Sequence, residues 1–242
     1  MLSEPTRRSL VWETRFIMLA FIYPSAITAV ILFIRSRLDV AGTGQLSGVT
    51  PGHPLANLLL GIPDYLAIAV IVPIALLLLQ RSGQPPSTLG LALPGWRSDI
   101  WPGFGLALAS LGSSMALAVV IGPFLNRHHN LTNQVSIGSV PHYYVIYGLV
   151  VAATTAITEE VIVNGYLLVR LEQLGWTPQR ALLLSLALRT SYHLYYGAAV
   201  LFTIPFGYFM TRSFQKHRRL TRPIVTHFMW DSILFTLAIL TS

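Results

Sequence analysis

Runs of mostly apolar residues follow one another along the chain, several of them near the 20 residues that cross a bilayer. The connections between them are short and contain arginine, glycine or proline. The fourth run is too long for one simple crossing, and the sixth is too short unless it shares residues with its neighbour. We therefore expect seven membrane spans, with eight as the main alternative. The predicted spans are 15–34, 56–79, 101–122, 142–171, 178–195, 198–210 and 223–240.

Composition places the chain in the membrane class. Hydrophobic residues make up 53% and charged residues 10% of its 242 residues, whereas a soluble domain carries about 25% charge. The predicted fold class is all-α, a polytopic transmembrane helix bundle with a buried polar cavity, forming one domain over 1–242. No small-residue cleavage site follows the first run, so we expect a retained span and not a signal peptide. The absence of cysteine excludes disulfides, thiolate metal sites and a cysteine nucleophile.

Positive charge is concentrated between the apolar runs. The net charge is +7, and cytoplasmic loops of membrane proteins accumulate lysine and arginine in this way. We expect a protein in the lipid bilayer with its N-terminus in the cytoplasm, in a prokaryotic plasma membrane because the chain is small and has no accessory domain. Nothing resembles a nucleic-acid-binding module, so no nucleic acid is expected as partner. The densest basic cluster is Arg212, Lys216, His217, Arg218, Arg219 and Arg222.

Polar residues inside three of the apolar runs are the candidate chemistry. An ionisable group at membrane depth costs a few kcal/mol or more, so it usually faces a polar cavity. A spacing of four residues puts two pairs of these side chains on one helix face each. Two carboxylates and two imidazoles could activate a water and stabilise an oxyanion. The three clusters are Glu159, Glu160 and Asn164; Arg189, Tyr192 and His193; and His227 with Asp231.

These motifs resemble the CPBP family, the CAAX prenyl protease and bacteriocin-processing intramembrane proteases. The matching segments are Glu-Glu-Val-Ile-Val-Asn-Gly-Tyr-Leu from Glu159, Arg-Thr-Ser-Tyr-His from Arg189, and His-Phe-Met-Trp-Asp from His227. They occur in the family's order and spacing, within a family-like catalytic core at 142–240. The resemblance implies a type II CAAX endopeptidase-like enzyme that cleaves a membrane-associated peptide or protein.

The resemblance also implies a role for each position. Glu159 would be the general base that activates water, and Glu160 would support it or contact substrate. His193 would help Glu159 to hold the water, while His227 with Asp231 would stabilise the oxyanion. Two histidines and a glutamate could bind zinc, but the resemblance favours a glutamate mechanism without a metal or other cofactor.

Two positions depart from the family pattern. Asn164 stands where the motif usually has arginine, and Asp231 where it usually has asparagine. Asparagine can only hydrogen-bond to a carboxylate, and an ionised aspartate cannot donate to an oxyanion. We expect Arg189 to supply part of the missing positive charge by neutralising one carboxylate, with Asn164 and Tyr192 as further supporting residues.

The expected depths of the site residues disagree. Counting about 1.5 Å per residue from the span ends puts His227 near the cytoplasmic face, the glutamates deeper, and His193 near the opposite face. Either the fifth span begins deeper than Pro178, or the long fourth span is broken near Glu160.

Two other classes of function stay open. A proton-coupled carrier could use Glu159, Glu160 and Asp64, although we find no internal repeat of the kind that carriers often show. A catalytically degenerate scaffold or immunity protein of the same family would explain Asn164 and Asp231. Asp64 itself is interpreted as a helix-start residue near the interface. We interpret residues 128–130 as part of a polar external loop.

Overall fold

The computed structural model describes residues 4–37, 68–91, 95–127 and 144–240, and these residues form helices and turns without a β-strand. The α-helices are α1 (Glu4–Arg37), α3 (Ile71–Arg81), α4 (Ile100–Arg127), α5 (Tyr144–Glu159), α6 (Leu168–Gln173), α7 (Pro178–Tyr192), α8 (Ile204–His217) and α9 (Thr221–Leu240). A π-helix, η3 (Glu160–Leu167), joins α5 to α6. Short 3-10 segments are η1 (Pro86–Leu89), η2 (Trp96–Asp99), η4 (Leu194–Tyr196) and η5 (Ala198–Thr203).

The all-α membrane fold is confirmed. Three helical stretches of the described part, Thr6–Ile31, Trp96–Leu125 and Tyr144–Gln173, are long and apolar enough to cross a membrane. Each of the seven predicted spans overlaps a described helix. The sixth prediction, 198–210, is wrong in its limits, because 198–203 is a 3-10 segment and the α-helix runs from Ile204 to His217. Pro205 near the start of α8 fits this boundary, since proline is favoured in the first helical turn. Asp64 and residues 128–130 lie outside the described residues.

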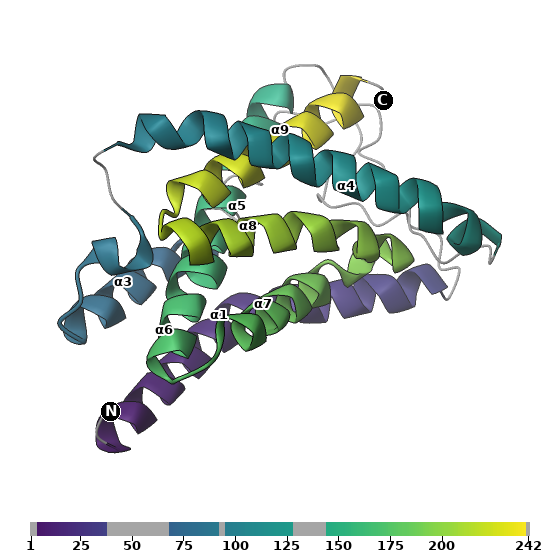
Figure 1. Cartoon of the computed structure of the whole chain (residues 1–242). Helices are drawn as coiled ribbons and strands as arrows, with labels where there is room; N and C mark the ends of the chain where they lie inside the picture. Colours follow the sequence, from purple (N-terminus) through teal and green to yellow (C-terminus); the bar gives the residue numbers. More distant parts are fainter. Residues whose placement is uncertain (1–3, 38–67, 92–94, 128–143, 241–242) are drawn as a thin grey trace.

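The helices pack around the π-helix. α4 crosses over α8 and α9, and α1 runs beside α7 at the opposite side of the bundle (Figure 1). α5 packs against α9. All eight residues of η3 are buried, and its apolar members join a core with side chains from α1, α3 and α8. The segment that begins with the second glutamate is thus at the centre of the protein.

The turn between α8 and α9 lies close to the π-helix. The backbone N–H of Leu220 donates to the carbonyl of Gly90 (3.0 Å), and a Cβ on Gly165 would lie 3.2 Å from Leu220 Cδ2. α9 therefore begins beside the middle of η3, only five residues from Glu160. α7 begins at Pro178 with a Thr177 cap, and the fourth span changes from α-helix to π-helix at Glu160.

Buried ion pairs fix the start of α9. The carboxylate of Asp99 is fully buried and contacts Nε of Arg219 (2.5 Å) and Nε of Arg222 (2.7 Å). One turn further, Thr226 donates to the carbonyl of Gly103 on α4 (2.9 Å). Part of the basic cluster therefore serves to hold α9 in place, which the sequence did not reveal.

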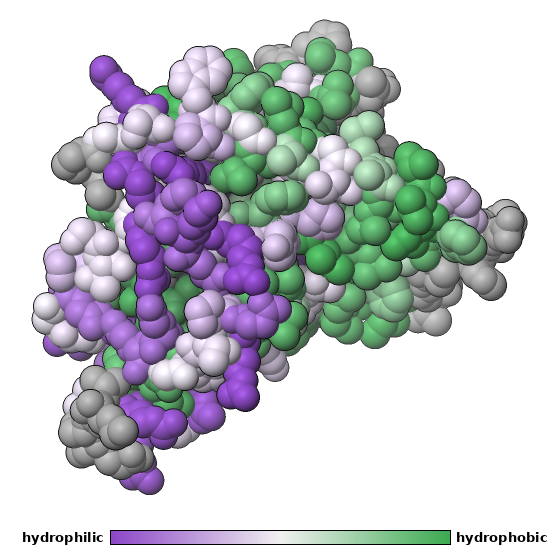
Figure 2. Space-filling view, viewed as in Figure 1, coloured by the Kyte–Doolittle hydropathy of each residue, from purple (hydrophilic) through white to green (hydrophobic). Residues whose placement is uncertain are grey.

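Hydrophilic side chains gather at one end of the molecule, over α3, the start of α9 and the N-terminal end of α1 (Figure 2). The other end of this face is mainly hydrophobic. This separation matches a bundle that contacts lipid along most of its length and water at one end.

Candidate active site

The two adjacent glutamates lie where α5 passes into η3. Glu159 is the last residue of α5 and Glu160 the first of η3. The side chain of Glu160 has no exposed surface and that of Glu159 is 11% exposed. Buried carboxylates of this kind need partners that offset their lost hydration. π-Helical turns are rare and occur frequently at functional sites.

Arg189 on α7 contacts both carboxylates. Its Nη1 lies 3.3 Å from Oε2 of Glu159, and its Nη2 lies 2.8 Å from Oε1 of Glu160. The guanidinium is itself buried, with 5% of the side chain exposed. One guanidinium therefore bridges two neighbouring carboxylates, so the suggested neutralising contact of Arg189 is present.

Glu160 has further donors on both oxygens. The side-chain amide of Asn164 donates to Oε2, and His227 Nδ1 lies 2.7 Å from Oε1. Since an ionised carboxylate only accepts, Asn164 must present its NH2 group to Glu160 and its carbonyl oxygen elsewhere. That oxygen accepts from the hydroxyl of Thr211 on α8 (2.9 Å). Thr211 Oγ1 lies 3.2 Å from Oγ of Ser185 on α7, which is then the donor. A chain of buried hydrogen bonds therefore fixes the orientation of Asn164.

His227 lies between two carboxylates. Its Nε2 is 3.4 Å from Oδ2 of Asp231, the partner expected from the spacing of four residues. The edge-on ring of Phe206 packs against it at 5.0 Å between centroids, and Phe206 also contacts Trp230. The contact at Nδ1 is short and that at Nε2 is long, so Nε2 is the nitrogen that is freer to meet a substrate atom.

Tyr192 and His193 complete the site at the end of α7. The hydroxyl of Tyr192 donates to Oε2 of Glu159 (2.7 Å). His193 Nδ1 lies 3.1 Å from the carbonyl of Arg189, so Nδ1 carries the proton and Nε2 of the neutral ring keeps a lone pair. The His193 ring packs against the rings of Tyr192 and Tyr195 at 4.7 and 5.8 Å. It also lies within electrostatic range of Glu159 and Asp231.

All eight residues singled out from the sequence therefore lie in one region. Seven are joined by direct side-chain contacts, and His193 adjoins them through the Arg189 carbonyl and the Tyr192 ring. The sequence did not identify Ser185, Thr211, Phe206 or Trp230. Small hydroxyl residues and aromatic residues are common in apolar helices, so their only signal was membership of the same spans.

The arrangement does not present the donor set of a zinc site. Both nitrogens of His227 face carboxylates, and in the described part of the chain no group of three or more histidine, aspartate and glutamate side chains is arranged to hold a metal ion.

Residues 139–233 match the family described as type II CAAX prenyl endopeptidase Rce1-like. This part of the chain is similar to an Rce1-like domain. The matched range contains all eight site residues, and the resemblance to the CPBP family is confirmed. At the level of the family, the Rce1-like domain is that of a CAAX-protease-like membrane endopeptidase. Comparisons with curated proteins and with solved structures found no match.

Proposed function

We propose that this protein is an intramembrane endopeptidase in which Glu159 activates a water molecule to hydrolyse a peptide bond of a membrane-associated substrate. The observation that carries the proposal is the unequal state of the two glutamates. Glu160 is fully buried and accepts from Arg189, Asn164 and His227. Among the described residues, the contacts of Glu159 involve Oε2 only. Glu159 Oε1 is therefore the carboxylate oxygen available to a water.

The surrounding groups suit this role. Tyr192 and Arg189 hold Oε2, which leaves Oε1 without a hydrogen bond from the described side chains. Water would be held between Oε1 and the lone pair on His193 Nε2, both of which accept its hydrogens. On attack at the carbonyl carbon, Glu159 takes one proton, and it returns that proton to the leaving amine when the C–N bond breaks.

His227 is placed to stabilise the oxyanion. Glu160 and Asp231 lie on either side of its ring, so their negative charge favours a ring that carries two protons. Nε2–H would then swing from the long contact with Asp231 to donate to the oxyanion. In this proposal Glu160 is a positioning residue, because it acts through His227 and Arg189.

The degenerate-scaffold alternative is favoured only by the two departures from the family pattern. Arg189 already supplies a cation that contacts both glutamates, so arginine at position 164 is not needed to bring a positive charge to the site. Asn164 is also fully buried. We therefore expect Asn164→Arg to lower activity by overfilling the site.

The test is cleavage of a library of membrane-tethered peptides by purified protein in nanodiscs, analysed by mass spectrometry. Wild type, Glu159→Ala and Asn164→Arg are compared. We expect cleavage products from wild type and none from Glu159→Ala. A silent wild type together with an active Asn164→Arg variant would instead identify a disabled protease.

A further inference from the structure

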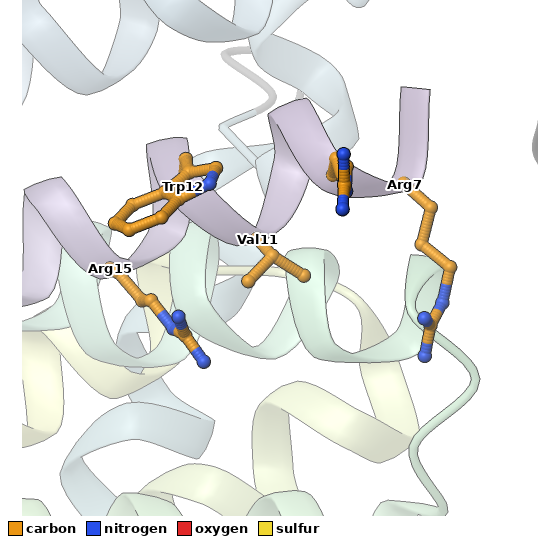
Figure 3. Close-up of a pocket in the computed structure, with 5 residues that line it drawn as sticks. Arg7, Val11, Trp12 and Arg15 are labelled. Atoms are coloured by element: carbon orange, nitrogen blue, oxygen red, sulfur yellow. The ribbon is translucent and has the colours of Figure 1, made fainter. Parts of the chain in front are cut away.

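A basic hollow lies on the first turns of α1, and neither Glu159 nor Glu160 lines it. It is open, has a volume of about 390 Å³ and is lined by Arg7, Arg8, Val11, Trp12 and Arg15. Arg7 and Arg15 extend from the helix to the same side, with Val11 between them (Figure 3). The Arg15 guanidinium lies 5.5 Å from the centroid of the Trp12 ring. Three positive charges thus surround one small volume.

Among the side chains that the structure describes, which do not include that of Glu4, no carboxylate forms an ion pair with Arg7, Arg8 or Arg15. Glu13, which lies between Trp12 and Arg15 in sequence, is directed elsewhere: its Oε2 is 3.5 Å from Nη2 of the buried Arg170, and its Oε1 accepts from Ser9. The hollow is therefore suited to an anion from outside the protein.

The same side of α1 continues as an apolar, exposed face. Leu19, Tyr23 and Val30 follow Trp12 after about two, three and five helical turns, so they lie on its side of the helix. Trp12, Leu19, Tyr23 and Val30 are 67%, 61%, 60% and 41% exposed. Along this side of α1, guanidinium groups are followed by an indole and then by Leu19, Tyr23 and Val30. A bilayer presents phosphate, interface and acyl chains in that order, and tryptophan is enriched at the interface.

We propose that Arg7, Arg8, Trp12 and Arg15 bind the phosphate of an anionic membrane lipid whose acyl chains lie along the exposed face of α1. The arginines hold the phosphate oxygens, and their excess positive charge selects lipids with net negative charge over zwitterionic ones. Trp12 packs beside the glycerol region. This site is independent of the proposed peptidase activity.

The test uses tryptophan quenching by lipids brominated on the upper acyl chain. Full-length protein is reconstituted with brominated phosphatidylglycerol or brominated phosphatidylcholine, and the signal of Trp12 is obtained by subtracting Trp12→Phe. We expect phosphatidylglycerol to be preferred at Trp12 by about tenfold or more, since each basic residue near an anionic surface contributes about fivefold.

Two variants with equal charge locate the preference. When Arg7, Arg8 and Arg15 are replaced together by glutamine, we expect the ratio of phosphatidylglycerol to phosphatidylcholine binding at Trp12 to fall close to one. Replacing Arg81, Arg180 and Lys216, which are also exposed, by glutamine is expected to leave it intact. The proposal is overturned if wild type shows no preference at Trp12, or if the control variant loses it as fully as the first variant. Either result would mean that any attraction comes from the overall charge alone.

Discussion

At the residue scale, Glu159 and Glu160 differ in the number of partners that occupy their oxygens. Glu160 accepts from Arg189, Asn164 and His227 and is fully buried. Glu159 is held through one oxygen. The first carboxylate in the sequence is thus available for chemistry, whereas the second joins three helices through its contacts. The two should respond differently to the loss of charge.

Glu160→Gln is expected to lower the free energy of unfolding by about 3–5 kcal/mol, because it leaves a buried guanidinium and imidazole with one carboxylate fewer. Glu172→Gln is the matched control. Its side chain is 58% exposed and pairs with Arg218 at the surface, so its loss should cost about 1 kcal/mol or less. Reversible denaturation in detergent measures both. Equal losses of unfolding free energy would show that the buried contacts of Glu160 contribute no more to stability than an exposed ion pair.

Tyr192→Phe is expected to lower kcat/KM by about 10- to 100-fold, the value of one hydrogen bond to a charged group. The variant removes the donor to Glu159 while the ring keeps its contacts with Phe21 and His193. Tyr208→Phe, on the exposed surface of α8, should leave turnover unchanged. Wild-type turnover in Tyr192→Phe would show that the Tyr192 hydroxyl does not contribute to catalysis.

The identity of the site residues could be predicted from the sequence because charged side chains are conspicuous in apolar runs. The pairs Glu160–Asn164 and His227–Asp231 follow from helical spacing alone, and both contacts are present. Thr211 could not be predicted in the same way, since a hydroxyl residue in an apolar helix usually bonds to its own backbone. Its contact with Asn164 depends on how α8 lies against η3.

At the element scale, the position of α9 sets the geometry of His227. The turn before α9 lies beside Gly165, and the helix is held by Asp99 and by close packing on α4. Counting residues from the span ends could not show this, because the calculation assumes that every basic loop lies at the membrane surface. The buried carboxylate of Asp99 draws two arginines of this loop into the protein. The π-helix was likewise beyond prediction, since η3 has an ordinary apolar composition apart from Glu160 and Asn164.

Gly103→Ala is expected to destabilise the protein by about 1–3 kcal/mol and to lower turnover, because the added methyl group would overpack the contact between α4 and α9. Its Cβ would lie 2.8 Å from Cβ of Val225, two residues before His227. Gly105→Ala on the same helix meets no atom within 4 Å and should be neutral or stabilising by up to about 1 kcal/mol. Thermal unfolding and turnover of both variants test this. A Gly103→Ala protein that matches Gly105→Ala would contradict the close packing.

At the scale of the whole molecule, a polar end adjoins a mainly apolar body (Figure 2), and the charged groups around Glu160 are buried between the helices. The membrane class and the helical fold followed from composition and run length, since both depend on sums over many residues. The limits of the sixth span could not be predicted in this way, because the 3-10 segment that precedes α8 is at least as apolar as the helix itself.

Turnover of the intact protein is expected to be unaffected by metal chelators, because no donor set for a metal lies among the described residues and His227 is engaged by two carboxylates. The measurement is the cleavage rate after treatment with chelator and after addition of zinc. A loss of activity that zinc restores would contradict the proposed metal-free mechanism.

The most direct test of the central claim is the cleavage rate of Glu159→Gln relative to wild type, on one membrane-tethered peptide and with folding verified by thermal unfolding. Glutamine keeps the size of the side chain but cannot take a proton from water. We expect the variant to fold and its cleavage rate to fall by about 10²- to 10⁴-fold, the contribution of a general base. A folded Glu159→Gln protein that cleaves at the wild-type rate would show that Glu159 is not the general base.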